Sequence, residues 1–161
     1  SLYTLADVIN AGCRDGELDV RGISHRGYFA SITDFKSYHD ANMDLIDYKT
    51  ATDLFHDNWP IYTRTNNSCP THYFDTANVS NSVISNGSMI EGTVENSIVG
   101  RGCTIKKGAV IKNCVVLADC TIGENVHIEN LVVDKHAKIT HAKEIIRPAG
   151  EPGYIKRNDT L

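Results

Sequence analysis

Aliphatic residues recur from Val79 to Ile139 at a period that fits neither a helix nor a single strand. They form four triplets, and the steps within each triplet are always 5 and 6 residues. Successive triplets begin 15, 17 and 17 residues apart. An inward-pointing residue near every sixth position indicates a chain that passes through three short strands per coil. The positions are Val79, Ile84, Ile90; Val94, Val99, Ile105; Ile111, Val116, Ile122; Ile128, Val133 and Ile139.

The residues two positions before each of these aliphatic side chains support the same register. Ten of the twelve are small, as a tight corner beside an inward-pointing side chain requires. Two sets of positions therefore agree on a mainly β fold, a parallel β-helix of hexapeptide repeats with about four coils over residues 77–142. The twelve are Ala77, Ser82, Ser88, Gly92, Ser97, Cys103, Ala109, Cys114, Cys120, Val126, Leu131 and Ala137.

An asparagine stands third in the same six-residue phrase of every coil. The four phrases are "VSNSVI", "VENSIV", "IKNCVV" and "IENLVV". Equivalent residues of adjacent coils lie about 4.8 Å apart, as in neighbouring strands. We therefore expect a ladder in which each amide bonds to the next and each asparagine adopts a left-handed corner. Its members are Asn81, Asn96, Asn113 and Asn130.

The flanking segments have other patterns. Residues 1–57 mix α and β periods: a helix from the first residue of "SLYTLADVI", paired strands over "LDVRGIS" and "GYFASI", and a helix over "DFKSYHDANMDLID" with Asp34 as N-cap. This organisation predicts the C-terminal remnant of a larger α/β domain. Residues 58–76, with Pro60 and Pro70, are predicted to be a linker, and residues 143–161 a C-terminal tail.

Composition excludes some classes of function. The net charge of -4 lacks the excess of Lys and Arg that nucleic acid or an anionic membrane surface requires. The sequence has no run of about 18 apolar residues and no signal-like start, so we expect a cytoplasmic protein. No Gly-rich nucleotide-binding or P-loop motif is present.

The five cysteines include no C-x-x-C pair. Cys103 and Cys120 are one coil apart and are expected to stack as two buried thiols, which fits a reducing compartment better than a zinc site or a disulfide framework. The sequence leaves open whether these two residues pair.

Two groups of polar residues are candidates for chemistry. Arg101, Lys106, Lys107 and Lys112 form a basic patch in sequence, which is either a site for a phosphorylated effector or a solvated face. His127, His136 and His141 lie in or just after the last coils, where histidine can bind zinc or act as a general base in acyl transfer. The regular spacing of the coils leaves no room for the inserted loop that such chemistry uses.

Several segments together resemble a known family. "GYFASITDFKSYHDANMDLID" is similar to the "G-Y-W-x-D-I-G…Y…A-N-M-D-L-L" segment that closes the catalytic domain of bacterial glucose-1-phosphate adenylyltransferases. The similarity continues through "WPIYTR", "NSVISNGSMIEGTVENSIVGRG" and "EPGYIKRNDTL". It implies a left-handed β-helix, a role in making ADP-glucose from ATP and glucose 1-phosphate for glycogen synthesis, and a cytoplasmic oligomer.

One departure from that family concerns its metal site. The aspartate of the family's "W-x-D-I-G", which helps to hold Mg²⁺, is Ser31 here, and the tryptophan is Phe29. A hydroxyl is a poor ligand for a hard divalent cation compared with a carboxylate. The resemblance therefore points to the regulatory, GlgD-type subunit, with no catalytic residue, metal ligand or cofactor site in this chain. It implies that Mg²⁺ and ATP belong to a catalytic partner subunit, that this chain assembles with that partner or with itself, and that a sugar phosphate is a possible effector.

Two other readings of the sequence remain. One is a hexapeptide-repeat acyltransferase or sugar nucleotidyltransferase with an active site between coils. The other is an assembly module that binds no effector.

Overall fold

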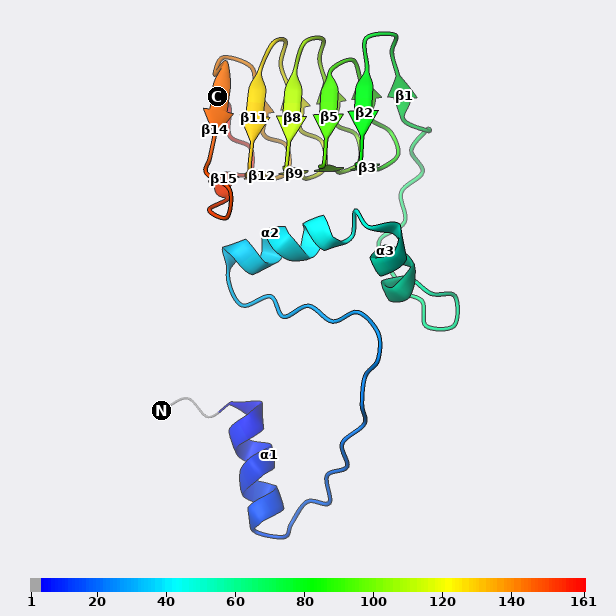
Figure 1. Cartoon of the computed structure of the whole chain (residues 1–161), viewed down its shortest axis with the longest axis vertical. Coiled ribbons are helices and arrows are strands. Elements are labelled where there is room, and N and C mark those ends of the chain that lie inside the picture. The colour runs from blue at the N-terminus through cyan, green and yellow to red at the C-terminus, as the bar shows by residue number, and fades with distance from the viewer. Residues whose placement is uncertain (1–3) are drawn as a thin grey trace.

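The computed structural model describes residues 4–161 and shows a parallel β-solenoid preceded by helices (Figure 1). Three helices precede the solenoid: α1 (Leu5–Arg14), α2 (Phe35–Asp44) and α3 (Tyr48–Leu54). The strands are β1 (His72–Tyr73), β2 (Asn78–Ser80), β3 (Val83–Ile84), β4 (Met89–Ile90), β5 (Thr93–Glu95), β6 (Ile98–Val99), β7 (Thr104–Ile105), β8 (Val110–Lys112), β9 (Val115–Val116), β10 (Thr121–Ile122), β11 (His127–Glu129), β12 (Leu131–Val133), β13 (Lys138–Ile139), β14 (Glu144–Ile146) and β15 (Gly153–Ile155).

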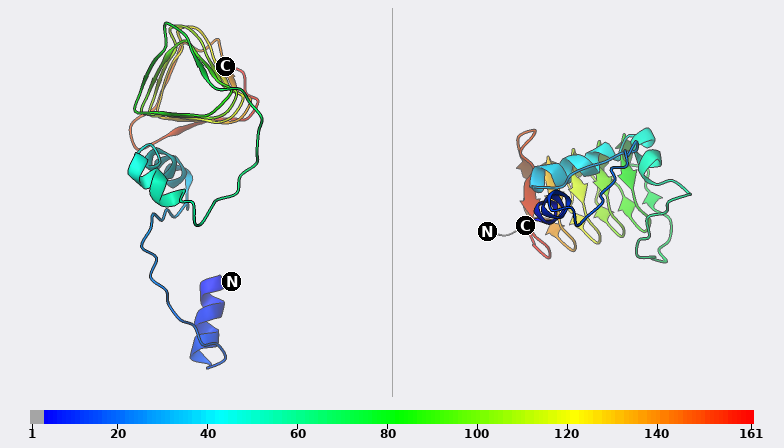
Figure 2. Two further views of the ribbon diagram at one scale, coloured as in Figure 1. Left: turned by 90° about the vertical axis from the view of Figure 1, so that its right-hand side faces the viewer. Right: turned by 90° about the horizontal axis from the view of Figure 1, so that it is seen from below.

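The strands form three parallel sheets that are the three sides of a triangular prism (Figure 2). The sheets are ordered β1-β4-β7-β10-β13, β14-β11-β8-β5-β2 and β15-β12-β9-β6-β3. The chain visits each sheet in turn, so it completes four turns between β1 and β13. The predicted fold, a β-helix of hexapeptide repeats with about four coils, is confirmed, and its left-handedness stays an expectation from the family resemblance.

The core consists of the aliphatic residues that the period identified. Val94, Ile111 and Ile128 are paired in register on three successive coils and are fully buried. The small residues beside them are required by backbone spacing. A Cβ added to Gly92 would lie 2.6 Å from the backbone oxygen of Ala109, closer than real Cβ atoms come. The corner serines also bond between coils, because Ser97 Oγ accepts from the backbone N–H of Cys114 at 3.0 Å.

The solenoid extends beyond residues 77–142 at both ends. Strand β1 lies in the predicted linker, and β14 and β15 lie in the predicted tail. Tyr73 occupies the inward position in register with Ile90. Because Tyr73 is aromatic, the pattern of aliphatic residues does not extend to this position. Ile155 pairs with Val133 from 22 positions away, because the chain makes an additional excursion around Gly150 before β15. The 17-residue repeat therefore ends before the solenoid does.

Helix α2 packs against the outer surface of the sheet that contains β9, β12 and β15 (Figure 2). On this sheet the outward-pointing residues include Val115 and Val132, whose exposed fractions are 0% and 2%. Apolar residues on an outer solenoid face require a cover. The Phe35 and Tyr154 rings meet edge to face, with 5.7 Å between their centroids. The helix therefore belongs to the same hydrophobic structure as the solenoid.

The N-terminal part agrees only partly with the sequence prediction. Asp34 caps α2 as expected, because its side chain accepts from the backbone N–H of Ser37 at 2.7 Å. The predicted strands over "LDVRGIS" and "GYFASI" are wrong, since residues 18–32 form no strand. Alternating residues indicate a strand only if a second strand supplies its hydrogen bonds, and this segment has no such neighbour in the described structure. Helix α3 was not predicted, and residues 1–3 of the predicted first helix lie outside the described residues.

Helices among residues 4–161 are all too short and too polar to cross a membrane.

Candidate functional site: a basic cavity at one corner of the solenoid

One corner of the solenoid gathers residues from three successive coils. In each coil the chain turns here from one sheet to the next at a residue with positive φ. The residues just before these turns are Arg101, Ala118 and Lys135. Those turning residues are Gly102, Asp119 and His136. The coils are joined here by backbone hydrogen bonds, for example from the N–H of Asp119 to the oxygen of Arg101 at 2.8 Å. Side chains from residues 17 or 34 positions apart therefore lie on one surface.

A cavity of about 470 Å³ opens at this corner. Residues 64–66 form a second wall, which is held in place because Arg101 Nη1 donates to the backbone oxygen of Arg64 at 3.0 Å. The C-terminal segment supplies Arg157. Asp119 and His136 also line the cavity, with 3.6 Å between their Oδ2 and Nδ1 atoms. The full lining is Arg64, Thr65, Asn66, Arg101, Ala118, Asp119, Lys135, His136 and Arg157.

The charge of this cavity suits an anion. Four cationic side chains face one carboxylate, in a protein whose net charge is -4. Guanidinium groups bind phosphate oxygens in pairs, and Lys adds a point charge. A concave surface lined mainly by one sign of charge also concentrates the electric field on a bound ion. The arrangement can hold a phosphorylated small molecule, and it presents no nucleophile paired with a base.

The basic patch predicted from the sequence does not form as one group. Arg101 lines the cavity, but Lys106 and Lys107 are exposed at a different corner, between β7 and β8. Lys112 points from the next sheet and pairs with Glu95, with 3.2 Å between Nζ and Oε2. Proximity in sequence was misleading because each coil directs neighbouring residues to different faces. The 34-residue interval from Arg101 to Lys135, two coils of the repeat, was the signal available to find the second cation.

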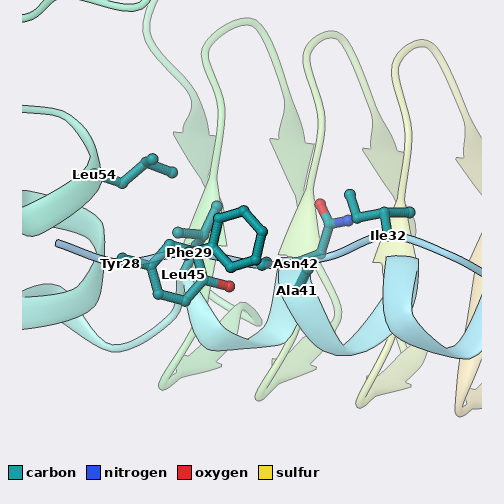
Figure 3. A pocket seen from close by; sticks show the side chains of 8 residues that line it. Tyr28, Phe29, Ile32, Ala41, Asn42, Leu45 and Leu54 are labelled. Atoms are coloured by element: carbon teal, nitrogen blue, oxygen red, sulfur yellow. The ribbon is translucent and has the colours of Figure 1, made fainter. Parts of the chain in front are cut away.

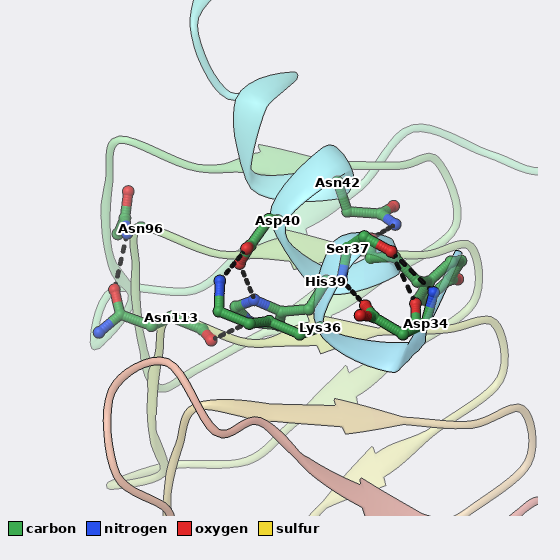
Figure 4. A network of polar contacts seen from close by, with 9 residues as sticks. Asp34, Lys36, Ser37, His39, Asp40, Asn42, Asn96 and Asn113 are labelled. Atoms are coloured by element: carbon green, nitrogen blue, oxygen red, sulfur yellow. Dashed lines mark hydrogen bonds and ion pairs between the residues drawn. The ribbon is translucent and has the colours of Figure 1, made fainter. Parts of the chain in front are cut away.

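The four ladder asparagines all have positive φ, between 42° and 54°. Asn81 Nδ2 donates to Asn96 Oδ1 at 2.8 Å, and Asn96 Nδ2 donates to Asn113 Oδ1 at 2.6 Å (Figure 4). Asn130 Nδ2 instead donates to the backbone oxygen of Arg147 at 2.6 Å. The His39 Nε2 atom lies 3.0 Å from the backbone oxygen of Asn113, so the ladder also anchors α2. These contacts give the ladder a structural role.

The three histidines of the last coils lie apart. His127 Nε2 lies 2.6 Å from Glu129 Oε1 on the outer face of β11. His136 belongs to the basic cavity, and His141 is exposed after β13. Residues 4–161 contain no cluster of three His, Cys, Asp or Glu side chains suited to a metal.

The cysteines of the solenoid are buried. The Cys103, Cys114 and Cys120 side chains are at most 1% exposed, and all five cysteines are free. The hydrogen bond with Cys120 and burial raise the pKa of the Cys103 thiol, and burial raises the pKa of Cys114 to about 12. Cys103 and Cys114 therefore carry little thiolate at neutral pH, and thiolate is the reactive form. The hydrogen bond with Cys103 lowers the pKa of the Cys120 thiol, so Cys120 is protected by its burial alone.

We therefore expect iodoacetamide at pH 8 to label Cys13 and Cys69, which are exposed, and to leave the three solenoid cysteines unmodified until the protein unfolds. Mass spectrometry of the native and urea-unfolded protein measures this directly. Labelling of Cys114 as fast as Cys69 in the native state would contradict the buried assignment.

The two residues that flank Ser31, Ala30 and Ile32, line an apolar pocket of about 350 Å³ (Figure 3). The pocket is lined by Tyr28, Phe29, Ala30, Ile32, Ala41, Asn42, Leu45 and Leu54, with no carboxylate among them. Ser31 itself is exposed. These residues do not fit a Mg²⁺ site, because a hard divalent cation requires carboxylate or carbonyl oxygens held together.

The fold and its repeat place the protein in the class of hexapeptide-repeat proteins. Residues 70–147 match the sequence model of the family described as "GlmU-like, C-terminal hexapeptide". Residues 70–147 are therefore similar to this family.

The chain is also homologous to glucose-1-phosphate adenylyltransferases and to GlgD. It is 38% identical to "Glycogen biosynthesis protein GlgD" of Bacillus subtilis over 133 residues, which are 83% of this chain and 39% of the relative. It is 42% identical to "Glucose-1-phosphate adenylyltransferase" of Geobacillus stearothermophilus over 86 residues, 53% of this chain and 22% of the relative. Against the enzyme of the same name from Bacillus mycoides it is 36% identical over 122 residues, 76% of this chain and 32% of the relative. The alignments thus cover 22% to 39% of the length of these curated relatives.

Proposed function

We propose that this chain is part of a regulatory subunit of glucose-1-phosphate adenylyltransferase. In this role it supports cytoplasmic ADP-glucose synthesis for glycogen through subunit assembly and through the binding of a phosphorylated effector, and it is not itself catalytic. The homology to GlgD and to the adenylyltransferases supports the pathway. The observation that carries the regulatory part is the basic cavity, where four cations from different coils and the linker face one space.

The departure at the metal position supports the non-catalytic part of the proposal. Ser31 and the pocket beside it offer no carboxylate for Mg²⁺. A catalytic partner subunit would therefore supply the Mg²⁺ and ATP sites. In that arrangement this chain acts through its contacts and through the anion that it binds.

A direct test of the role is co-expression of the full-length protein with its catalytic partner. ADP-glucose synthesis is then measured across effector concentrations, with and without the regulatory chain. We expect the mixture to respond to a sugar phosphate differently from the partner alone. If the partner alone gave the same rate and the same response, the regulatory proposal would be wrong.

The Arg101→Glu substitution tests the cavity itself. It removes one charge-assisted contact and adds a repelling charge, so we expect the affinity for pyrophosphate to fall by at least about tenfold. Isothermal titration of the full chain measures the change. Arg157→Glu should act in the same direction without touching the hydrogen bond between Arg101 and Arg64.

The matched control is Lys106→Glu, which makes the same type of charge change at an exposed corner outside the cavity. It should leave the affinity within about twofold of the unsubstituted chain, because Lys106 does not contact the cavity and salt screens its charge from an ion bound at another corner. Equal losses in Lys106→Glu and Arg101→Glu would show nonspecific attraction of the anion, and the cavity would not be the site.

A further inference from the structure

Tyr154 contacts both helix α2 and a corner of the solenoid. It stands at the outward position of β15, in register with Val132. Its ring packs edge to face with that of Phe35, the first residue of α2, at an interplanar angle of 75°. Its hydroxyl donates to Asp134 Oδ2 at 2.6 Å. One side chain therefore bonds to the solenoid corner and packs against the helix.

Asp134, which accepts a hydrogen bond from the Tyr154 hydroxyl, lies next to the basic cavity. It precedes Lys135, whose backbone N–H donates to Asp134 Oδ1 at 2.7 Å. The hydrogen bond from Tyr154 lowers the pKa of Asp134, and the charges of Arg157 and Lys135 lower it further. Both of these cations line the cavity. The Asp134 carboxylate thus shares its stabilising charges with the proposed anion site.

An anion in the cavity changes the surroundings of this carboxylate. The charges of Arg157 and Lys135, which lower the pKa of Asp134, also attract the anion, and the anion adds a negative charge nearby. The hydroxyl of Tyr154 then carries a larger share of the stabilisation of Asp134, because hydrogen bonds to an ionised acceptor strengthen as other partners withdraw. A stronger bond holds the Tyr154 ring, and with it the contact to Phe35, in place.

We infer that Tyr154 is a positioning residue that couples an anion bound in the basic cavity to the packing of helix α2 on the solenoid. The inference rests on the proposed function, since it specifies how that cavity communicates. Helix α2 is held at its start by Phe35 and in its middle by the contact of His39 with Asn113 (Figure 4). Tyr154 also connects the helix to the cavity, because it donates to Asp134, and Asp134 accepts from the cavity residue Lys135. Fixing it reduces local opening of the first turn of the helix.

The experiment is amide hydrogen exchange of α2 in the full chain, with and without saturating pyrophosphate. We expect pyrophosphate to slow exchange in the first turn of α2 by roughly threefold to tenfold, the size of one hydrogen bond's net contribution. Tyr154→Phe keeps the ring against Phe35 but removes the hydroxyl. This variant should bind pyrophosphate within about threefold of the unsubstituted affinity, and it should lose the slowing in α2.

Tyr73→Phe is the matched control, because Tyr73 is as exposed as Tyr154, at 51% each, and lies on β1 at the other end of the solenoid. It should respond as the unsubstituted chain does. Slowing of α2 that persists in Tyr154→Phe would overturn the coupling role. Loss of pyrophosphate binding in Tyr154→Phe would also overturn it, since the hydroxyl would then build the cavity. If the unsubstituted chain failed to bind pyrophosphate, the proposed function itself would be refuted.

Discussion

Replacing Ile111 by alanine is expected to lower the free energy of unfolding by about 3 kcal/mol. Ile111 is fully buried at the centre of the solenoid, between Val94 on one coil and Ile128 on the next. The substitution removes three carbon atoms from a stack in which coils repeat at the spacing of neighbouring strands. The backbone ladders on both sides hold that spacing, so the cavity cannot collapse. Urea unfolding followed by circular dichroism measures the loss.

The control is Ile146→Ala, the same change at an outward position of β14 where the side chain is 45% exposed. It should cost less than about 1 kcal/mol, because much of that side chain already contacts water. If the two variants had equal urea midpoints, the inward and outward assignments along these sheets would be incorrect.

The period of the aliphatic residues was enough to predict most of the solenoid. The inward residues from Ile90 to Ile139 recur in the sequence because they occupy equivalent positions of stacked coils. A parallel stack of coils can bury its aliphatic side chains only at these equivalent positions. The prediction failed at the ends for the same reason. Tyr73 and Ile155 occupy inward positions, but one is aromatic and the other follows an interruption, so neither continues the pattern.

Contacts between segments far apart in the chain were the part that the sequence did not reveal. Val115 and Val132 stand beside the inward residues Val116 and Val133, and only the structure shows that both are buried and that α2 packs against the strand of Val115. The cavity is likewise formed by segments that lie far apart in the chain. Arg64 comes from the linker, Arg157 from the last segment and Arg101 from a coil, and no periodic signal joins these three. The cluster of basic residues in the sequence favoured Lys106 and Lys107 instead, and these lie at a different corner of the solenoid.

Asn96→Ala is expected to lower the free energy of unfolding by about 3 to 4 kcal/mol, through two separate effects. The backbone of Asn96 has a φ of 45°, and a left-handed conformation costs an ordinary residue about 1 to 2 kcal/mol. The side chain also makes two ladder bonds, accepting from Asn81 and donating to Asn113, each with a net contribution of about 1 kcal/mol. Thermal or urea unfolding of the full chain gives the total.

Asn96→Gly separates the two effects, because glycine adopts positive φ without strain and still removes the amide. We expect it to be more stable than Asn96→Ala and less stable than the unsubstituted chain, so that the difference between the variants reports the backbone cost. Pyrophosphate affinity should be unchanged in both, since Asn96 does not line the basic cavity. An Asn96→Ala variant with full stability but weakened pyrophosphate binding would reverse the assignment and make the ladder part of the binding site.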